Sequence, residues 1–276
     1  MYARRFPIRR GKLRLIDSLW QAAAGGRGVY RLADLKYGRF RMACDLSLML
    51  QRQYYFFGTY FLEEKLLDCW EKEVRGAKVI FDVGANAGIY SLVALAIQPD
   101  VIVHAFEPTP EIAAHLRETA ALNGLDHLFV HEVAVLSKNG RAVLKRFRGE
   151  LGTNEGMNYI SEKFGESGAE RVQTVCLDQF CKDHAIDRID LLKLDIQGNE
   201  HSALKGAECL LQNGRIGIIF MELNWAENSA VVCPASESIA LLEKTGYKFS
   251  AAGKCMDWKK SGEWMRSLAD IIACRV

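Results

Sequence analysis

The chain has 276 residues, of which 49% are hydrophobic and 25% charged, and its 36 basic residues nearly balance its 34 acidic ones. This composition is typical of a globular protein and excludes a disordered or fibrous chain. The net charge of +2 gives no support for a nucleic-acid-binding protein, and the length suits one catalytic domain with a terminal extension. The eight cysteines form no C-x-x-C pair, so we expect reduced thiols, no metal centre and a cytoplasmic location.

The first 75 residues are rich in aromatic and basic side chains and differ from the rest of the chain. The first fourteen carry six positive charges and no acid, which indicates either a solvated end or an arm for an anionic partner. The sequence shows neither a secretory signal nor an apolar run long enough to span a membrane. We predict that residues 1–75 are an accessory segment that covers the acceptor site of a catalytic domain at 76–276.

Downstream of residue 76, apolar runs alternate with helical patterns. Strands are predicted at 79–83, 101–107, 128–135, 191–195, 216–222 and 269–276, and helices at 88–97, 110–122, 199–212 and 235–246. This alternation predicts an α/β fold, a doubly wound and mostly parallel Rossmann-like sheet, with its ligand site at the carboxyl ends of the strands. Two insertions interrupt the pattern, at 137–176 and 251–266, and the first predicts a hairpin and flap over the sheet edge.

The turn after the first of these strands is the most informative segment. A dinucleotide-binding turn requires glycine at its first, third and sixth positions, which here hold Gly84, Asn86 and Ile89. This mismatch disfavours NAD and FAD. The tighter register of first, third and fifth positions holds Gly84, Asn86 and Gly88, a spacing that suits the amino-acid tail of S-adenosylmethionine. The amide of Asn86 is suited to bind the carboxylate of that tail.

An acid ends the next strand, where adenosyl cofactors need one. Glu107 stands twenty-five positions after Asp82, in the segment HAFEPTP. A carboxylate at that place accepts both hydrogens of a ribose diol. Pro108 and Pro110 then end the strand and start the following helix. The glycine turn and this acid together predict an adenosyl ligand.

In combination, these motifs resemble the FkbM family of S-adenosylmethionine-dependent methyltransferases, a class I group, over roughly residues 40–250. The matching segments are DVGANAGIYSL (82–92), AFEPTP (105–110), Asn123–Gly124, EVAVLSKNG (132–140), Leu177–Asp178, IDLLKLDIQGNEHSALKGA (189–207), Glu222 and the lead-in at 45–61. The resemblance implies methyl transfer to a hydroxyl oxygen of a sugar, glycan or polyketide-type acceptor. One departure is Gln197, where the family commonly has glutamate.

The resemblance also implies which residues bind S-adenosylmethionine. They are Asp82, Gly84, Asn86 and Gly88 for the methionine part, Glu107 and Pro108 at the ribose, Glu132, Val133 and Ala134 at the adenine, and Asp195 beside the sulfonium. Each of them lies at or just after the carboxyl end of a predicted strand, where a doubly wound sheet binds its ligands.

Methyl transfer to an alcohol also needs a group that removes the hydroxyl proton. The candidates are Asp195, His201 and Glu222, with Glu200 as a further acid nearby. Asp195 is preferred because its place at the end of the fourth strand does not depend on details of the fold. The acids could instead hold a divalent cation, but strand-end acids are frequent in this fold, so no metal is predicted.

Acceptor recognition is predicted from amide and aromatic side chains outside the main pattern. These are Asn154 and Asn158 in the GTNEGMNY loop, Tyr55 in the N-terminal segment and Trp258 in the second insertion. We expect a small-molecule or glycan partner, and the sequence leaves the oligomeric state open. Two alternative functions remain at this point, namely a nicotinamide-dependent dehydrogenase and a non-catalytic adenosyl-binding scaffold.

Overall fold

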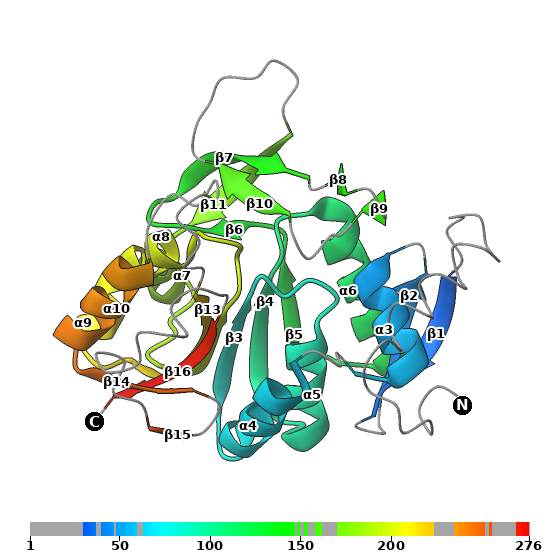
Figure 1. Cartoon of the computed structure of the whole chain (residues 1–276), viewed down its shortest axis with the longest axis horizontal. Helices are drawn as coiled ribbons and strands as arrows, with labels where there is room; N and C mark the ends of the chain where they lie inside the picture. The colour runs from blue at the N-terminus through cyan, green and yellow to red at the C-terminus, as the bar shows by residue number, and fades with distance from the viewer. Residues whose placement is uncertain are drawn as a thin grey trace.

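An eight-stranded sheet organises the chain (Figure 1). The computed structural model describes residues 30–36, 40–46, 48–59, 63–146, 148–149, 152–153, 158–161, 170–223, 235–251, 254–255 and 269–275. The strand order is β15-β14-β16-β13-β12-β3-β4-β5. The parallel strands are β3 (Val79–Val83), β4 (Ile102–Phe106), β5 (Leu128–His131), β12 (Ile189–Leu194) and β13 (Ile216–Leu223). The mostly parallel sheet predicted from the sequence is therefore confirmed.

One edge of this sheet is antiparallel. It is formed by β14 (Tyr247–Ala251), β15 (Lys254–Cys255) and β16 (Ala269–Arg275). The last strand lies between β13 and β14 and runs against both. The predicted strand at 269–276 therefore exists but reverses direction, which the apolar pattern of its residues cannot reveal, because parallel and antiparallel central strands are equally buried.

Helices cover both faces of the sheet and create two separate cores. One face packs against α4 (Glu64–Val74), α5 (Ile89–Ile97) and α6 (Pro110–Asn123). The other packs against α7 (Leu177–Asp183), α8 (Glu200–Lys205), α9 (Glu208–Gln212) and α10 (Ala235–Lys244). Neighbouring strand residues alternate between the cores: Ile80 belongs to the first and Phe81 to the second. None of the helices among the described residues is long and apolar enough to cross a lipid bilayer.

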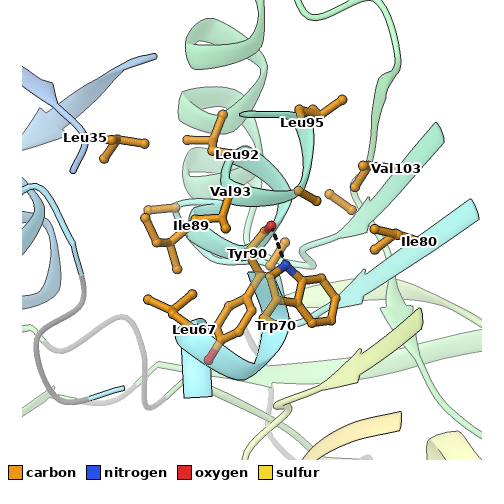
Figure 2. Close-up of a cluster of buried hydrophobic side chains, with 14 of the residues drawn as sticks. Leu35, Leu67, Trp70, Ile80, Ile89, Tyr90, Leu92, Val93, Leu95 and Val103 are labelled. Carbon is orange, nitrogen blue, oxygen red and sulfur yellow. Dashed lines mark hydrogen bonds between the residues drawn. The ribbon is translucent and has the colours of Figure 1, made fainter. Parts of the chain in front are cut away.

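The N-terminal segment packs on the first of these cores. A hairpin of β1 (Tyr30–Asp34) and β2 (Arg41–Asp45) lies with α3 (Met49–Phe57) beside α6 (Figure 1). Trp70 of α4 is fully buried and meets the rings of Tyr90 and Phe220 edge-on. Its Nε1 donates to the carbonyl oxygen of Tyr90 at 3.1 Å (Figure 2). Helix α4 is thus part of the same core as the sheet.

The predicted strand at 128–135 is two strands in two sheets. After β5 the chain leaves the large sheet, and β6 (Ala134–Val135) pairs with β11 (Arg171–Val175) in a four-stranded sheet of order β10-β7-β11-β6. That sheet also contains β7 (Gly140–Lys145) and β10 (Tyr159–Ser161), and a short pair, β8 (Arg148–Gly149) and β9 (Gly152–Thr153), follows β7. The extended pieces predicted within 137–176 are thus confirmed, and we call this sheet the flap.

The predicted helix at 199–212 is also divided. Helix α8 ends at Gly206, where an added Cβ would come within 2.2 Å of the carbonyl oxygen of Leu136. The carboxylate of Asp178 accepts the backbone N–H groups of Cys209 and Leu210, both at 2.9 Å, and so caps a new helix, α9. This capping acid lies in α7, which the sequence pattern did not predict.

Candidate active site

A cavity of about 330 Å³ opens at the carboxyl ends of the parallel strands. Strand β3 pairs with β4 on one side and β12 on the other, so the strand order reverses beside it, which is where doubly wound sheets bind ligands. The described residues that line the cavity come from the large sheet, the flap, α3 and α5. Of the residues predicted from the sequence, the lining includes Gly84, Asn86, Glu107, Pro108, Val133, Ala134, Asn158, Asp195 and Glu222.

Two glycines in the turn after β3 serve different purposes. Gly84 has φ 77°, and an added Cβ would lie 1.9 Å from the carbonyl oxygen of Asp195, so only glycine lets β3 and β12 approach this closely. Gly88 has φ 84°, and its added Cβ would lie 2.3 Å from Leu116 Cδ1. Gly88 is not part of the cavity lining. Its predicted contact with the cofactor is therefore replaced by close packing of α5 on α6.

Asn86 stabilises the same turn through its backbone conformation and its side-chain amide. Its φ of 49° is unusual for a residue other than glycine, and asparagine tolerates this region best. Its Oδ1 accepts the backbone N–H of Ala87 at 2.6 Å, which fixes the amide at the cavity wall.

Asp82 lies behind the turn instead of in the cavity. It is fully buried, and its Oδ2 accepts the backbone N–H of Ser91 at 3.1 Å and the Ser91 hydroxyl at 2.6 Å. Burial raises the pKa of Asp82 above its ordinary value. The structure thus places Asp82 outside the cavity lining, where its carboxylate ties β3 to α5, and its contact with the methionine part stays a prediction.

Glu107 is fixed at the cavity wall by two backbone donors. Its Oε2 accepts the N–H of Asn86 at 3.0 Å and its Oε1 accepts the N–H of Thr109 at 2.8 Å. Burial raises the pKa of Glu107, and these two hydrogen bonds partly offset the effect. Each oxygen keeps further lone pairs, so the carboxylate is oriented to accept a ribose diol.

The wall beside Glu107 is apolar and suits a flat adenine ring. It is formed by Phe106, Pro108, Val133, Ala134 and Val135. The side chain of Glu132 is exposed and forms an ion pair with Arg117 at 2.9 Å, so it is not part of this wall. The glycine turn, a fixed carboxylate and an apolar slot together fit an adenosyl cofactor.

The part of the cavity lined by Asp195 and Glu222, which adjoins the turn at Gly84 and which we call the charged end, contains a network of charged groups. Lys193 Nζ lies 3.2 Å from Asp195 Oδ2 and 4.6 Å from the centre of the Tyr90 ring. The Nε2 of Gln197 donates to Asp195 Oδ1 at 2.9 Å and to Glu222 Oε2 at 3.0 Å. Burial alone would raise the pKa of Asp195, but Lys193 and Gln197 outweigh it and hold that pKa below its ordinary value. Asp195 is therefore ionised at neutral pH.

Residues before the sheet domain complete this end. Leu50 and Tyr54 of α3 line the cavity, as does Glu63, which accepts the hydroxyl of Tyr90 at 2.5 Å. The predicted Tyr55 instead packs edge-on against Phe56, with ring centres 5.1 Å apart, and is outside the lining. The aromatic contact from this segment is thus made one residue earlier than expected. Asn154 and Trp258, also predicted as acceptor contacts, lie outside the described residues.

His201 points away from the cavity. Its Nε2 lies 3.6 Å from Glu237 Oε2 of α10, and it does not belong to the lining. Burial lowers its pKa. The structure thus places the imidazole of His201 beside α10 and outside the cavity lining, and its role as a base stays a prediction.

Glu200 supports the turn after β12. Its Oε1 accepts the backbone N–H of Ile196 at 2.9 Å and of Gly198 at 3.2 Å. Its carboxylate therefore binds the backbone of this turn and does not form a three-acid metal site with Asp195 and Glu222. Among the described residues, no group of three or more His, Cys, Asp or Glu side chains is arranged to hold a metal ion.

The buried Glu200 should make stability depend on pH. Burial raises its pKa to about 7 from 4.5, so folding favours its protonated form, and its contribution to stability is lost as pH rises from 4.5 through 7. We expect wild type to lose about 3 kcal/mol relative to Glu200→Gln between pH 4 and pH 8. Urea unfolding of both proteins across this range measures the difference. A constant difference at all pH values would contradict the assignment.

The sequence contained little indication of the cavity-lining residues that were not predicted. Lys193 is a charged residue inside the apolar strand LLKLD, and a buried lysine in such a strand needs a carboxylate partner. Glu63 and Tyr90 carry no comparable signal, because they are 27 positions apart and meet only through packing.

The chain is similar to known methyltransferases. Residues 82–249, more than half of the chain, match the model of the Methyltransferase FkbM domain. The 2-O-methyltransferase NoeI of Sinorhizobium fredii is 31% identical over 150 residues, which are 50% of this chain and 60% of that protein. The 31-O-demethyl-FK506 methyltransferase FkbM of Streptomyces tacrolimicus is 30% identical over 160 residues, 49% and 62% of the two chains.

These two alignments span about 60% of the length of each relative. Among solved structures, the human methyltransferase 10 domain containing protein is 12% identical and superposes with a TM-score of 0.45, over 95% of both chains. The fold assignment stands on the strand order described above.

Proposed function

This chain belongs to the FkbM family of methyltransferases, and from that premise we propose that it transfers a methyl group to a hydroxyl oxygen of a sugar, glycan or polyketide-type acceptor. Its cofactor is S-adenosylmethionine, as in the methyltransferase family that it matches. Membership of this family removes the nicotinamide-dependent dehydrogenase from consideration.

The observation that carries the proposal is that one cavity brings together two chemically distinct sets of groups. The turn at Gly84 and Asn86 and the carboxylate of Glu107 suit the methionine and ribose parts of the cofactor. Asp195 and Glu222 line the charged end, which adjoins the turn at Gly84 and which we propose as the acceptor end, where a hydroxyl needs a proton acceptor. The names of both aligned relatives refer to an oxygen: one is a 2-O-methyltransferase, and the other is a 31-O-demethyl-FK506 methyltransferase.

In this proposal the chain contributes alignment and a base. When bound, the cofactor supplies an electrophilic methyl group. Asp195, kept ionised by Lys193, accepts the proton of the attacking hydroxyl, and Glu222 accepts a hydrogen bond from a second hydroxyl of the acceptor. The apolar residues Leu50 and Tyr54 exclude water from this end of the cavity.

A mass-shift screen tests the proposed activity. The protein and S-adenosylmethionine are incubated with a library of glycosides and hydroxylated polyketides, and products one methyl group heavier are sought by mass spectrometry. Formation of a methyl ether supports O-methylation. Tight binding of S-adenosylhomocysteine without turnover of any acceptor would favour a non-catalytic adenosyl-binding scaffold, and methylation at nitrogen would contradict the assigned acceptor atom.

We further propose that the N-terminal segment, residues 1–75, covers the acceptor site, because α3 contributes Leu50 and Tyr54 to the cavity. Tyr54→Ala should raise the KM for the acceptor roughly tenfold, since it removes an aromatic wall, and should also lower the Tm, because Tyr54 is buried in the core. Tyr55→Ala is the matched control, because the neighbouring ring packs on Phe56 and should leave KM within about twofold. Steady-state kinetics on the acceptor found by the screen measures both. Equal effects of the two changes would contradict the cover.

A further inference from the structure

Gln197 occupies a position between two carboxylates. Its Nε2 lies 2.9 Å from Asp195 Oδ1 and 3.0 Å from Glu222 Oε2, so one nitrogen serves both acids. The assignment of the amide nitrogen follows from chemistry, because ionised carboxylates only accept hydrogen bonds and only the NH2 end donates. Gln197 also belongs to the cavity lining, so this bridge lies at the acceptor end of the site.

Two carboxylates this close to each other need compensation. Like charges sharing a site raise the pKa of one acid until it takes a proton, unless a cation or hydrogen-bond donors relieve the repulsion. Lys193 Nζ supplies a cation to Asp195 at Oδ2, the oxygen that faces away from the bridge. The two N–H groups of Gln197 add one hydrogen bond to each acid.

We infer that Gln197 is the positioning residue of this site, and that its side-chain amide takes the place that a cation or a proton would otherwise occupy between Asp195 and Glu222. The amide binds both acids and fixes their separation, ready to receive two hydroxyl groups of one acceptor. This inference deepens the proposed function, because it concerns the same two acids, but its test requires no acceptor.

The backbone at Gln197 does not depend on its own side chain. The residue has φ 53° and is followed by Gly198 with φ 99°, and Glu200 accepts the backbone N–H groups on either side of it. Glutamate has nearly the same size as glutamine. The variant Gln197→Glu should therefore fold with the turn preserved and change only the charge between the two acids.

Other charged groups near the bridge come from several elements and remain unchanged in this variant. They are Lys193 on β12, Asp82 on β3, Glu200 on α8 and Glu63 before α4. Glu200 has a pKa of about 7 and accepts the backbone N–H groups on either side of position 197, so a glutamate at 197 should also shift the titration of Glu200. The comparison is therefore repeated in a Glu200→Gln background. The pH-dependent difference that remains there reports the new group at position 197 and its two partners.

The experiment compares wild type, Gln197→Glu and the double variant Gln197→Glu/Glu222→Gln, all purified at pH 5.5. The double variant restores two acids and one amide. Thermal unfolding is followed from pH 5.5 to 8, and binding of Mn²⁺ is followed by electron paramagnetic resonance. We expect the Tm deficit of Gln197→Glu to grow by about 5 °C as pH rises, because its third acid must lose a proton. We also expect it to bind Mn²⁺ at least roughly tenfold more tightly than wild type.

Both effects should disappear in the double variant. Three outcomes would overturn the inference: a Tm deficit that is the same at every pH, Mn²⁺ binding by wild type as tight as by Gln197→Glu, or effects that persist in the double variant. The first would mean that Gln197 has a purely structural role. If the inference holds and no acceptor is ever methylated, the proposed function fails on its own, since neither measurement involves turnover.

Discussion

Replacement of Asp195 by asparagine is expected to lower kcat by a factor of roughly 100 to 10,000 while changing the affinity for S-adenosylmethionine little. Asparagine preserves the shape of the side chain but cannot accept a proton from the acceptor hydroxyl. Single-turnover kinetics gives the rate of the chemical step, and calorimetry with S-adenosylhomocysteine gives the affinity. Loss of affinity and rate in equal measure would mean that Asp195 only holds the cofactor.

The ion pair with Lys193 complicates this experiment, and a second variant resolves it. Asp195→Asn leaves a buried ammonium without its nearest carboxylate, which should destabilise the fold by about 3 kcal/mol. The double variant Asp195→Asn/Lys193→Met removes that orphaned charge and should recover much of the stability. The rate should stay low in the double variant. Recovery of the rate together with stability would show that the ion pair, and not proton transfer, explains the first result.

Replacement of Glu107 by alanine is expected to weaken cofactor binding by about 2 to 4 kcal/mol. The change removes the predicted ribose contact and also the two hydrogen bonds that Glu107 accepts from the N–H groups of Asn86 and Thr109. Calorimetry with S-adenosylhomocysteine measures the loss. Unchanged affinity would refute the ribose assignment.

A ligand that lacks one hydroxyl separates the two roles of Glu107. Wild type should bind 5′-methylthioadenosine more tightly than its 2′-deoxy analogue, whereas Glu107→Ala should bind both alike. If the variant still prefers the ligand with the hydroxyl, then Glu107 only supports the turn, and the ribose is held by another group.

The fold and the cofactor end of the site could be predicted because their signals are local in the sequence. Alternating apolar runs specify the strands, and the glycine turn and Glu107 follow strand ends directly. The errors have physical causes that the sequence does not show at short range. Asp82 was predicted to contact the ligand, but its carboxylate accepts hydrogen bonds from Ser91. One strand prediction joined β5 to β6 because only two residues separate these strands.

The acceptor end could be predicted only in part, because it is assembled from distant segments. Asp195 and Glu222 follow from their places at strand ends, whereas Tyr54 on α3, Glu63 before α4 and Lys193 on β12 meet only in the packed structure. Neighbouring residues on a helix point about 100° apart, so the choice between Tyr54 and Tyr55 depends on how α3 is rotated against the sheet domain. A run of aromatic residues predicts that a helix packs against the rest of the protein, but it does not show which of these residues faces the cavity.

The flap described above contributes to both parts of the cavity. It has a small core of its own, formed by Ala134, Leu136, Ala142, Leu144, Ile160 and Val172. Its strand β6 carries Ala134 and Val135 of the apolar wall that suits adenine, and Asn158 lines the cavity just before β10. The flap is held at the start of α8 by Asn199, whose Nδ2 donates to the carbonyl oxygen of Ile160 at 3.0 Å. We therefore expect substitutions around Asn158 to change the range of acceptors, whereas substitutions in β6 should change cofactor binding as well.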